Sequence, residues 1–228
     1  NKAFQYLKKA EDLGNIAALN QLGLYYKNIK KDKETSIKYL KKAAAKNYPY
    51  AFNNLGMIYE KEKNYELAFK YYLKSAELEE SWACNKVGEF YRLGTHCQKD
   101  LKKAFIYYKT ALDVPKNLQN NYAKYNLAKY FYLNGCYEIE VEKNISHALN
   151  LLEDASNHNL LEATIELLNY YTKLYFQKKE NKTLEKINQL LFKIENHPLY
   201  NKKQKEQIEI TINTLKKEEK INRNLFKD

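Results

Sequence analysis

The side chains of this sequence that could act as nucleophiles or metal ligands are three cysteines and four histidines. They are Cys84, Cys97, Cys136, His96, His147, His158 and His197. Cysteine catalysis needs a thiol and an imidazole that face each other, and the adjacent His96 and Cys97 would not do so. The chain contains no HExxH, phosphate-binding loop, nucleophile elbow or dinucleotide motif, and no Cys-x-x-Cys pair that would hold structural zinc. We therefore expect no enzyme, no catalytic residue, no cofactor and no metal, with a metal site at His96, Cys97 and a carboxylate as the alternative.

The cysteine count and the start of the chain bear on the compartment. Because the number of cysteines is odd, at least one lacks an internal partner, which favours a reducing compartment; a Cys97–Cys136 disulfide is the alternative. The sequence starts at Asn1 without methionine, so we interpret it as a fragment. We favour the cytoplasm, and secretion or the periplasm is the alternative. No apolar run of about 18 residues occurs, so no transmembrane segment is predicted.

The net charge is strongly positive, at +11, but its make-up does not favour nucleic acid as the partner. Of the 39 basic residues only Arg92 and Arg223 are arginine, and base-edge and bidentate phosphate recognition rely on arginine. Abundant Lys, Asn, Tyr and Ile instead fit the codon bias of an AT-rich bacterial genome. With 44% hydrophobic residues the chain is globular, and its 22 tyrosines favour a self-associating edge.

Apolar residues recur at helical spacing throughout the chain, and two helix types alternate. Helix A carries Ala, then usually Gly five residues later, then an aromatic residue three further on. The sets are Ala18/Gly23/Tyr26, Ala51/Gly56/Tyr59, Ala83/Gly88/Tyr91, Ala123/Ala128/Phe131 and Ala163/Leu168/Tyr171. Helix B carries a small residue, two large residues at +3 and +4, and a small one at +7. The sets are Ala3/Tyr6/Leu7/Ala10, Ser36/Tyr39/Leu40/Ala43, Ala68/Tyr71/Tyr72/Ser75, Ala104/Tyr107/Tyr108/Ala111 and Ala148/Leu151/Leu152/Ala155.

The spacing of the two helix types predicts an all-α solenoid. The interval from helix B to the next helix A is nearly constant and lengthens only where Pro115 lies, whereas the interval from A to B varies. Gly23, Gly56 and Gly88 fall inside helices, where Gly costs about 1 kcal/mol relative to Ala. This cost indicates that helices A and B cross at these positions with no room for a Cβ.

These repeats resemble the tetratricopeptide and Sel1-like repeat families. Residues 53–78 are similar to a tetratricopeptide unit. Residues 82–112 are similar to a Sel1-like unit, in which Gly94, Asp100 and Ala104 match the pattern of the family. The resemblance implies a right-handed α-α superhelix, a solenoid of antiparallel helix pairs.

The resemblance covers roughly residues 2–160 and fades after Ala163, where Leu168 replaces the Gly. We predict a repeat array over residues 1–199, with a partial first unit, and a C-terminal capping helix and tail over residues 200–228. In the predicted cap, Ile208, Ile212 and Leu215 share one face.

The resemblance also nominates a surface, because the inner face of helix A lines a concave groove in tetratricopeptide arrays. The matching positions are Asn20, Gln21, Leu24, Asn53, Asn54, Met57, Asn85, Lys86, Glu89, Arg92, Tyr122, Tyr125, Asn126, Lys129, Tyr132, Glu166 and Asn169, with Trp82 beside them. The recurrent Asn could bond an extended peptide backbone, since a carboxamide donates and accepts at once. Trp82, Tyr122 and Tyr125 would then be pockets for side chains. The alternative is that Asn is simply frequent in this repeat type and in this chain.

Without a catalytic constellation, function should lie in this surface. We predict a non-enzymatic protein-interaction module, a scaffold or adaptor that binds a partner peptide or helix in the groove. A regulatory or recruiting arm of a larger enzyme is the alternative, and a catalytic protein in its own right is the third hypothesis.

Overall fold

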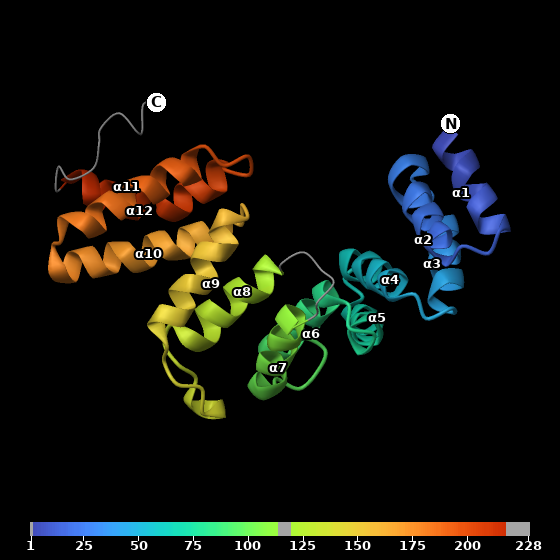
Figure 1. The fold of residues 1–228 in the computed structure, drawn as a ribbon, viewed down its shortest axis with the longest axis horizontal. Helices are drawn as coiled ribbons and strands as arrows, with labels where there is room; N and C mark the ends of the chain where they lie inside the picture. Colours follow the sequence, from blue (N-terminus) through green and yellow to red (C-terminus); the bar gives the residue numbers. More distant parts are fainter. Residues whose placement is uncertain (1, 114–119, 218–228) are drawn as a thin grey trace. The chain divides into compact units, whose positions relative to one another are not determined.

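The computed structural model describes residues 2–113 and 120–217, apart from some side chains of the last helix. Over these ranges the chain is all-α: no β-strand occurs, and one isolated bridge joins Cys136 and Val141. Successive helices pack against each other in pairs, as the periodicity predicts (Figure 1). The chain divides into two compact units, residues 1–120 and residues 121–228.

Unit 1 contains one B helix followed by three A–B pairs, and each predicted set lies on its expected helix. The A helices are α2 (Ile16–Tyr25), α4 (Pro49–Lys61) and α6 (Ser81–Leu93). The B helices are α1 (Lys2–Asp12), α3 (Lys33–Ala44), α5 (Tyr65–Glu77) and α7 (Leu101–Asp113). Helix α2 continues directly into a five-residue π-helix, η1 (Tyr26–Lys30).

Unit 2 carries the remaining pairs. Its elements are α8 (Asn121–Leu127), the π-helix η2 (Ala128–Tyr132), the 3-10 helix η3 (Tyr137–Ile139), α9 (Ile145–Asn157), α10 (Leu161–Lys178), α11 (Asn181–Glu195) and α12 (Lys202–Lys217). Ala128 and Leu168 occupy the Gly position of the A helices and are fully buried. Ile208, Ile212 and Leu215 of α12 join the core formed by α9, α10 and α11. The role of α12 as the cap of the array stays a prediction, and the predicted tail, 218–228, lies outside the described residues.

The glycines of the A helices mark the closest approach within each pair. A Cβ added at Gly23 would lie 2.7 Å from Leu40, one at Gly56 would lie 2.5 Å from the Tyr72 ring, and one at Gly88 would lie 2.7 Å from Tyr108. Each opposing residue is the +4 residue of the following B helix. The crossing inferred from the sequence is therefore confirmed.

A second contact recurs one turn further along each pair in unit 1, where the aromatic residue of helix A stacks on the +3 tyrosine of helix B. Tyr26 and Tyr39 stack with ring centroids 5.4 Å apart, Tyr59 and Tyr71 at 5.4 Å, and Tyr91 and Tyr107 at 5.8 Å. Both the +3 and the +4 residue of helix B have large side chains. The +4 residue packs against the Gly of helix A, and the +3 tyrosine packs against its aromatic residue.

The B helices α3, α5, α7 and α9 share an N-terminal signal four residues before their first small residue. Asp32 accepts a hydrogen bond from the backbone N–H of Thr35, Asn64 from that of Leu67, Asp100 from that of Lys103 and Asn144 from that of His147. Capping by Asp or Asn satisfies an otherwise unpaired donor of the first turn. This device fixes where each B helix begins, although the loop before it varies in length.

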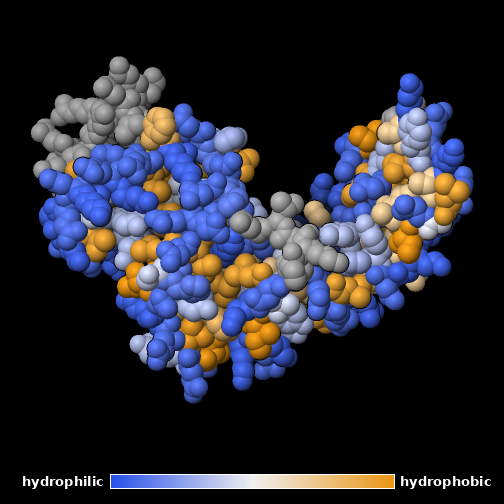
Figure 2. Space-filling view, viewed as in Figure 1, coloured by the Kyte–Doolittle hydropathy of each residue, from blue (hydrophilic) through white to orange (hydrophobic). Residues whose placement is uncertain are grey.

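The surface is mostly polar. Hydrophilic residues dominate the face drawn in Figure 2, and apolar residues gather there in small patches. Within the part of the chain that the structure describes, no helix has the length and apolar character needed to cross a membrane.

Candidate functional site

A cleft of about 830 Å³ opens on the A-helix side of unit 1. It is lined by residues from η1, the start of α3, α4 and α6, so three successive repeats contribute to it. The lining residues are Lys27, Lys31, Lys33, Met57, Ile58, Glu60, Lys61, Glu62, Trp82 and Lys86. We call this surface the unit 1 cleft. It brings together Met57, Trp82 and Lys86 of the predicted groove positions.

The floor of the unit 1 cleft is apolar. Gly56 faces α5, and Met57 is turned by about 100° from it along the helix, which directs it into the cleft with 38% of its surface exposed. Trp82 is half-buried and packs edge-on against Tyr72, with ring centroids 5.7 Å apart. The floor therefore offers a thioether and an indole that are held in place by the helix crossing.

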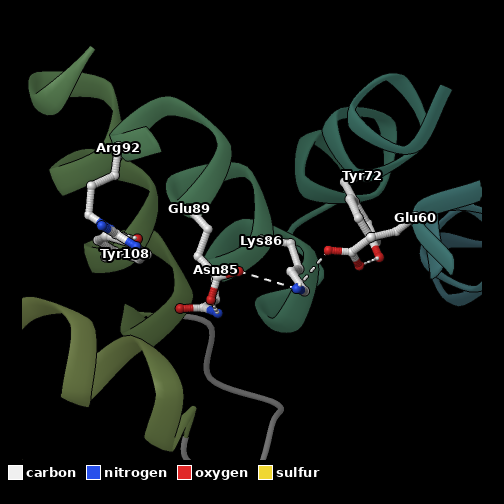
Figure 3. A network of polar contacts seen from close by, with 7 residues as sticks. All are labelled: Glu60, Tyr72, Asn85, Lys86, Glu89, Arg92 and Tyr108. Carbon is white, nitrogen blue, oxygen red and sulfur yellow. Dashed lines mark hydrogen bonds and ion pairs between the residues drawn. The ribbon is translucent and has the colours of Figure 1, made fainter. Parts of the chain in front are cut away.

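One wall of the cleft is a polar network that links α4, α5 and α6 (Figure 3). The Tyr72 hydroxyl donates to Glu60 Oε2 at 2.6 Å, and Lys86 Nζ donates to Glu60 Oε1 at 3.0 Å and to Glu89 Oε2 at 3.2 Å. Burial and the bond to Glu60 hold the pKa of Tyr72 well above its ordinary value. Burial lowers the pKa of Lys86, but Glu89 and Glu60 raise it by more, so Lys86 stays charged beside the Trp82 ring, 5.3 Å away.

The opposite rim carries cations that no carboxylate neutralises. Lys33 pairs with Glu62, whereas Lys27, Lys31 and Lys61 form no ion pair with any residue that the structure describes. Burial and the neighbouring charge of Lys61 lower the pKa of Lys27. The unit 1 cleft thus has five lysines and two glutamates, and both glutamates already have a lysine partner.

The predicted Asn positions are less open than an Asn ladder would need. Asn20 is 3% exposed, and its Oδ1 accepts from Asn54 Nδ2 at 2.9 Å, which ties α2 to α4. Asn85 is 2% exposed and donates to Glu89 at 3.3 Å. Asn53 is half-buried, and its buried Oδ1 has no partner among the described residues. Asn20 and Asn54 therefore bond each other between repeats, Asn85 bonds within its own helix, and peptide bonding by the ladder stays a prediction.

Arg92 also serves the helix pair. Its Nε donates to the Tyr108 hydroxyl at 3.3 Å (Figure 3).

In unit 2 the predicted positions form a separate group on α8 and η2. Lys129 Nζ donates to the Tyr125 hydroxyl at 2.8 Å and pairs with Glu166 at 2.9 Å. Burial lowers the pKa of Lys129, but these two partners raise it by more. Tyr122 is 43% exposed, while Asn126 is 4% exposed.

Tyr132, Glu166 and Asn169 are the remaining predicted positions of unit 2. Tyr132 is half-buried, with the His147 ring packed edge-on at 4.7 Å. Glu166 and Asn169 line a smaller cleft of about 510 Å³ beside α10.

The thiols and imidazoles are dispersed. All three cysteines are free, and burial raises the pKa of the Cys84 thiol to about 12. His96 stacks on Tyr65 at 5.4 Å, and His197 bonds the Asn159 carbonyl at 3.0 Å. Over the described ranges, no three His, Cys, Asp or Glu side chains converge as a metal site would require.

The lysines of the rim were not predicted from the sequence. Lys27 and Lys61 follow the last aromatic residue of their A helices, at Tyr26 and Tyr59, and face the cleft rather than solvent alone. A recurrent basic residue just after that aromatic residue was the available signal. Lysines are so frequent in this chain that the pattern does not stand out.

Comparison with known families assigns most of the chain to two repeat types. The Sel1 repeat model matches residues 1–15, 16–48, 83–113 and 121–160, which together exceed half of the chain. The tetratricopeptide repeat model matches residues 49–81. These segments confirm the resemblance of residues 53–78 to a tetratricopeptide unit and of residues 82–112 to a Sel1-like unit.

Solved structures show the same fold. The crystal structure of a Sel1 repeat protein from Oxalobacter formigenes is 29% identical, with a TM-score of 0.64, over 75% of this chain and 69% of that one. The structure of c5321, a protective antigen of uropathogenic Escherichia coli that displays an SLR fold, is 22% identical, with a TM-score of 0.68, over 84% of this chain and 40% of that one. The second likeness shows the fold alone. Among curated proteins, none matches the chain.

Proposed function

This chain belongs to the Sel1 repeat family, and from that premise we propose that it is a non-enzymatic scaffold or adaptor that binds a segment of a partner protein on its A-helix face. Repeat arrays of this kind generally mediate protein–protein interaction through extended surfaces. The bound segment would be an extended peptide or a helix.

The observation that carries this proposal is the unit 1 cleft. Three successive repeats contribute to it, and its floor of Met57 and Trp82 is apolar and open. A concave site with an apolar, aromatic floor and polar walls can bind a side chain of a partner protein. The recurrent glycine crossings and capped B helices support the proposal further, because they make a rigid frame.

Site-specific photo-crosslinking tests where a partner binds. A photoreactive phenylalanine analogue would replace Met57 in one variant and Lys70, exposed on the α5 surface, in a matched control. Crosslinks from position 57 to a defined partner, with none from position 70 to the same partner, are expected. Equal crosslinking from both positions would contradict binding on the A-helix face.

A further inference from the structure

We infer that the unit 1 cleft binds an acidic segment of a partner protein, with one large apolar side chain seated on Met57 and Trp82 and flanking carboxylates paired with Lys27 and Lys61. This inference rests on the proposed function and names the chemistry of the partner. The unit 1 cleft combines an apolar floor with lysines that pair with no carboxylate among the described residues.

The positive charge of the cleft favours a negatively charged ligand. Glu62 is held by Lys33 at 2.5 Å and Glu60 by Lys86 at 3.0 Å, so the cleft's own carboxylates are engaged. Lys27, Lys31 and Lys61 lie on the rim and pair with no carboxylate in the described part of the chain. An incoming carboxylate would gain a charge-assisted hydrogen bond without displacing an existing partner.

Lys27 is the most informative of these cations. It is half-buried in η1, and the charge of Lys61 acts on it, so it carries both desolvation and like-charge repulsion in the free protein. The attraction of a bound carboxylate would offset both unfavourable contributions. The π-helix that follows α2 places Lys27 beside the cleft, and its left-handed end residue, Lys31, belongs to the same rim.

The floor favours a peptide over a nucleic acid. Met57 and Ile58 present an aliphatic surface, and Trp82 is packed edge-on against Tyr72 rather than presented as a free stacking platform. Single-stranded nucleic acid is held by a cationic track together with exposed aromatic faces. The unit 1 cleft instead fits one apolar anchor with acidic neighbours.

The test is selection of random peptides displayed on phage by the full chain, followed by binding of the selected peptides in solution. The test variant is Lys27→Glu with Lys61→Glu. The matched control is Lys70→Glu with Lys74→Glu on the exposed side of α5, which changes the net charge equally. Circular dichroism checks that both variants keep the parent's helix content.

Selected peptides should be acidic with a large apolar residue. Their dissociation constants should rise about tenfold or more in the test variant and stay unchanged in the control. Added salt should weaken parent binding more than binding to the test variant.

Four outcomes overturn the inference. Selected peptides that are neutral or basic, or acidic peptides that bind both variants equally, contradict it while leaving peptide binding on the A-helix face intact. A labelled oligothymidylate that binds the parent more tightly than the peptides, and loses binding in the test variant, would assign the cleft to nucleic acid. Selection of no peptide at all would overturn both this inference and the proposed function.

Discussion

Gly56 and Tyr72 meet at the crossing of α4 and α5 so closely that a Cβ at residue 56 would lie 2.5 Å from the tyrosine ring. The ring cannot move aside cheaply, because Tyr72 is fully buried and its hydroxyl is bonded to Glu60 at 2.6 Å. The contact therefore joins the packing of one helix pair to the wall of the unit 1 cleft.

Gly56→Ala should destabilise the chain despite the better helix propensity of Ala. Overpacking at a tight crossing costs about 1–3 kcal/mol, which outweighs or cancels the gain of about 1 kcal/mol from propensity. Urea unfolding followed by circular dichroism measures the difference. Combining Gly56→Ala with Tyr72→Leu imitates the buried Ala128 and Leu152 of unit 2. The double variant should be more stable than the sum of the single effects predicts; strict additivity would show that the Cβ does not meet Tyr72.

Stability should fall in the alkaline range. Burial, together with the Glu60 bond, raises the pKa of Tyr72 in the folded chain. The unfolded chain loses that proton near the ordinary tyrosine pKa of about 10. Above that pH the unfolded state binds fewer protons than the folded state, so the free energy of unfolding decreases as pH rises.

Tyr72→Phe tests this origin of the alkaline instability. At neutral pH the variant should lose about 1.5–3 kcal/mol, because a hydrogen bond to a charged acceptor is removed. From about pH 9 to 11 its free energy of unfolding should decline less steeply than that of the parent. Parallel slopes for the two proteins would mean that Tyr72 does not contribute.

The side-chain cap of α5 should contribute measurably to the free energy of unfolding. Asn64 Oδ1 accepts from the backbone N–H of Leu67 at 3.2 Å, so Asn64→Ala should cost about 0.5–2 kcal/mol. Asn64→Asp keeps an acceptor and serves as the matched control, with near-parent stability expected. The urea concentrations at which Asn64→Ala and Asn64→Asp are half unfolded are compared with that of the parent. Equal losses in both variants would show that the side-chain acceptor is not what matters.

The sequence predicted the helix pairs well because their signals are local. Ala, Gly and an aromatic residue at fixed intervals specify one face of a helix, and the Gly56 position even predicted where the partner helix crosses. Capping by Asn64 and its equivalents was equally local but was recognised only at Asp100, as part of a family pattern.

The candidate site was harder to predict because it depends on how deeply each side chain is buried and on contacts between different repeats. The sequence placed Asn20 on the A-helix face, but it could not show that Asn54 of the next repeat covers and bonds it. Lys27 reaches the unit 1 cleft through the π-helical end of α2, a backbone detail that side-chain periodicity does not encode. Met57 and Trp82 were nominated through the resemblance to tetratricopeptide arrays, which fixes the groove positions relative to each Gly and so does not depend on knowing how the repeats meet.

Lys27 should lower the stability of the free protein, because it is half-buried, lies near the charge of Lys61 and has no carboxylate partner among residues 2–113 and 120–217. Lys27→Gln is expected to raise the free energy of unfolding, by no more than about 0.5 kcal/mol because solvent screens most of the repulsion. Lys33→Gln is the matched control: it breaks the pair with Glu62 and should lower stability slightly. Urea unfolding at low and high salt measures both effects. Because salt screens the repulsion between Lys27 and Lys61, the difference in free energy of unfolding between Lys27→Gln and the parent should be smaller at high salt. A lower free energy of unfolding in Lys27→Gln than in the parent would mean that Lys27 makes a favourable contact in the free protein. Lys27 would then not be available to pair with an acidic segment, which would contradict the inference about the partner.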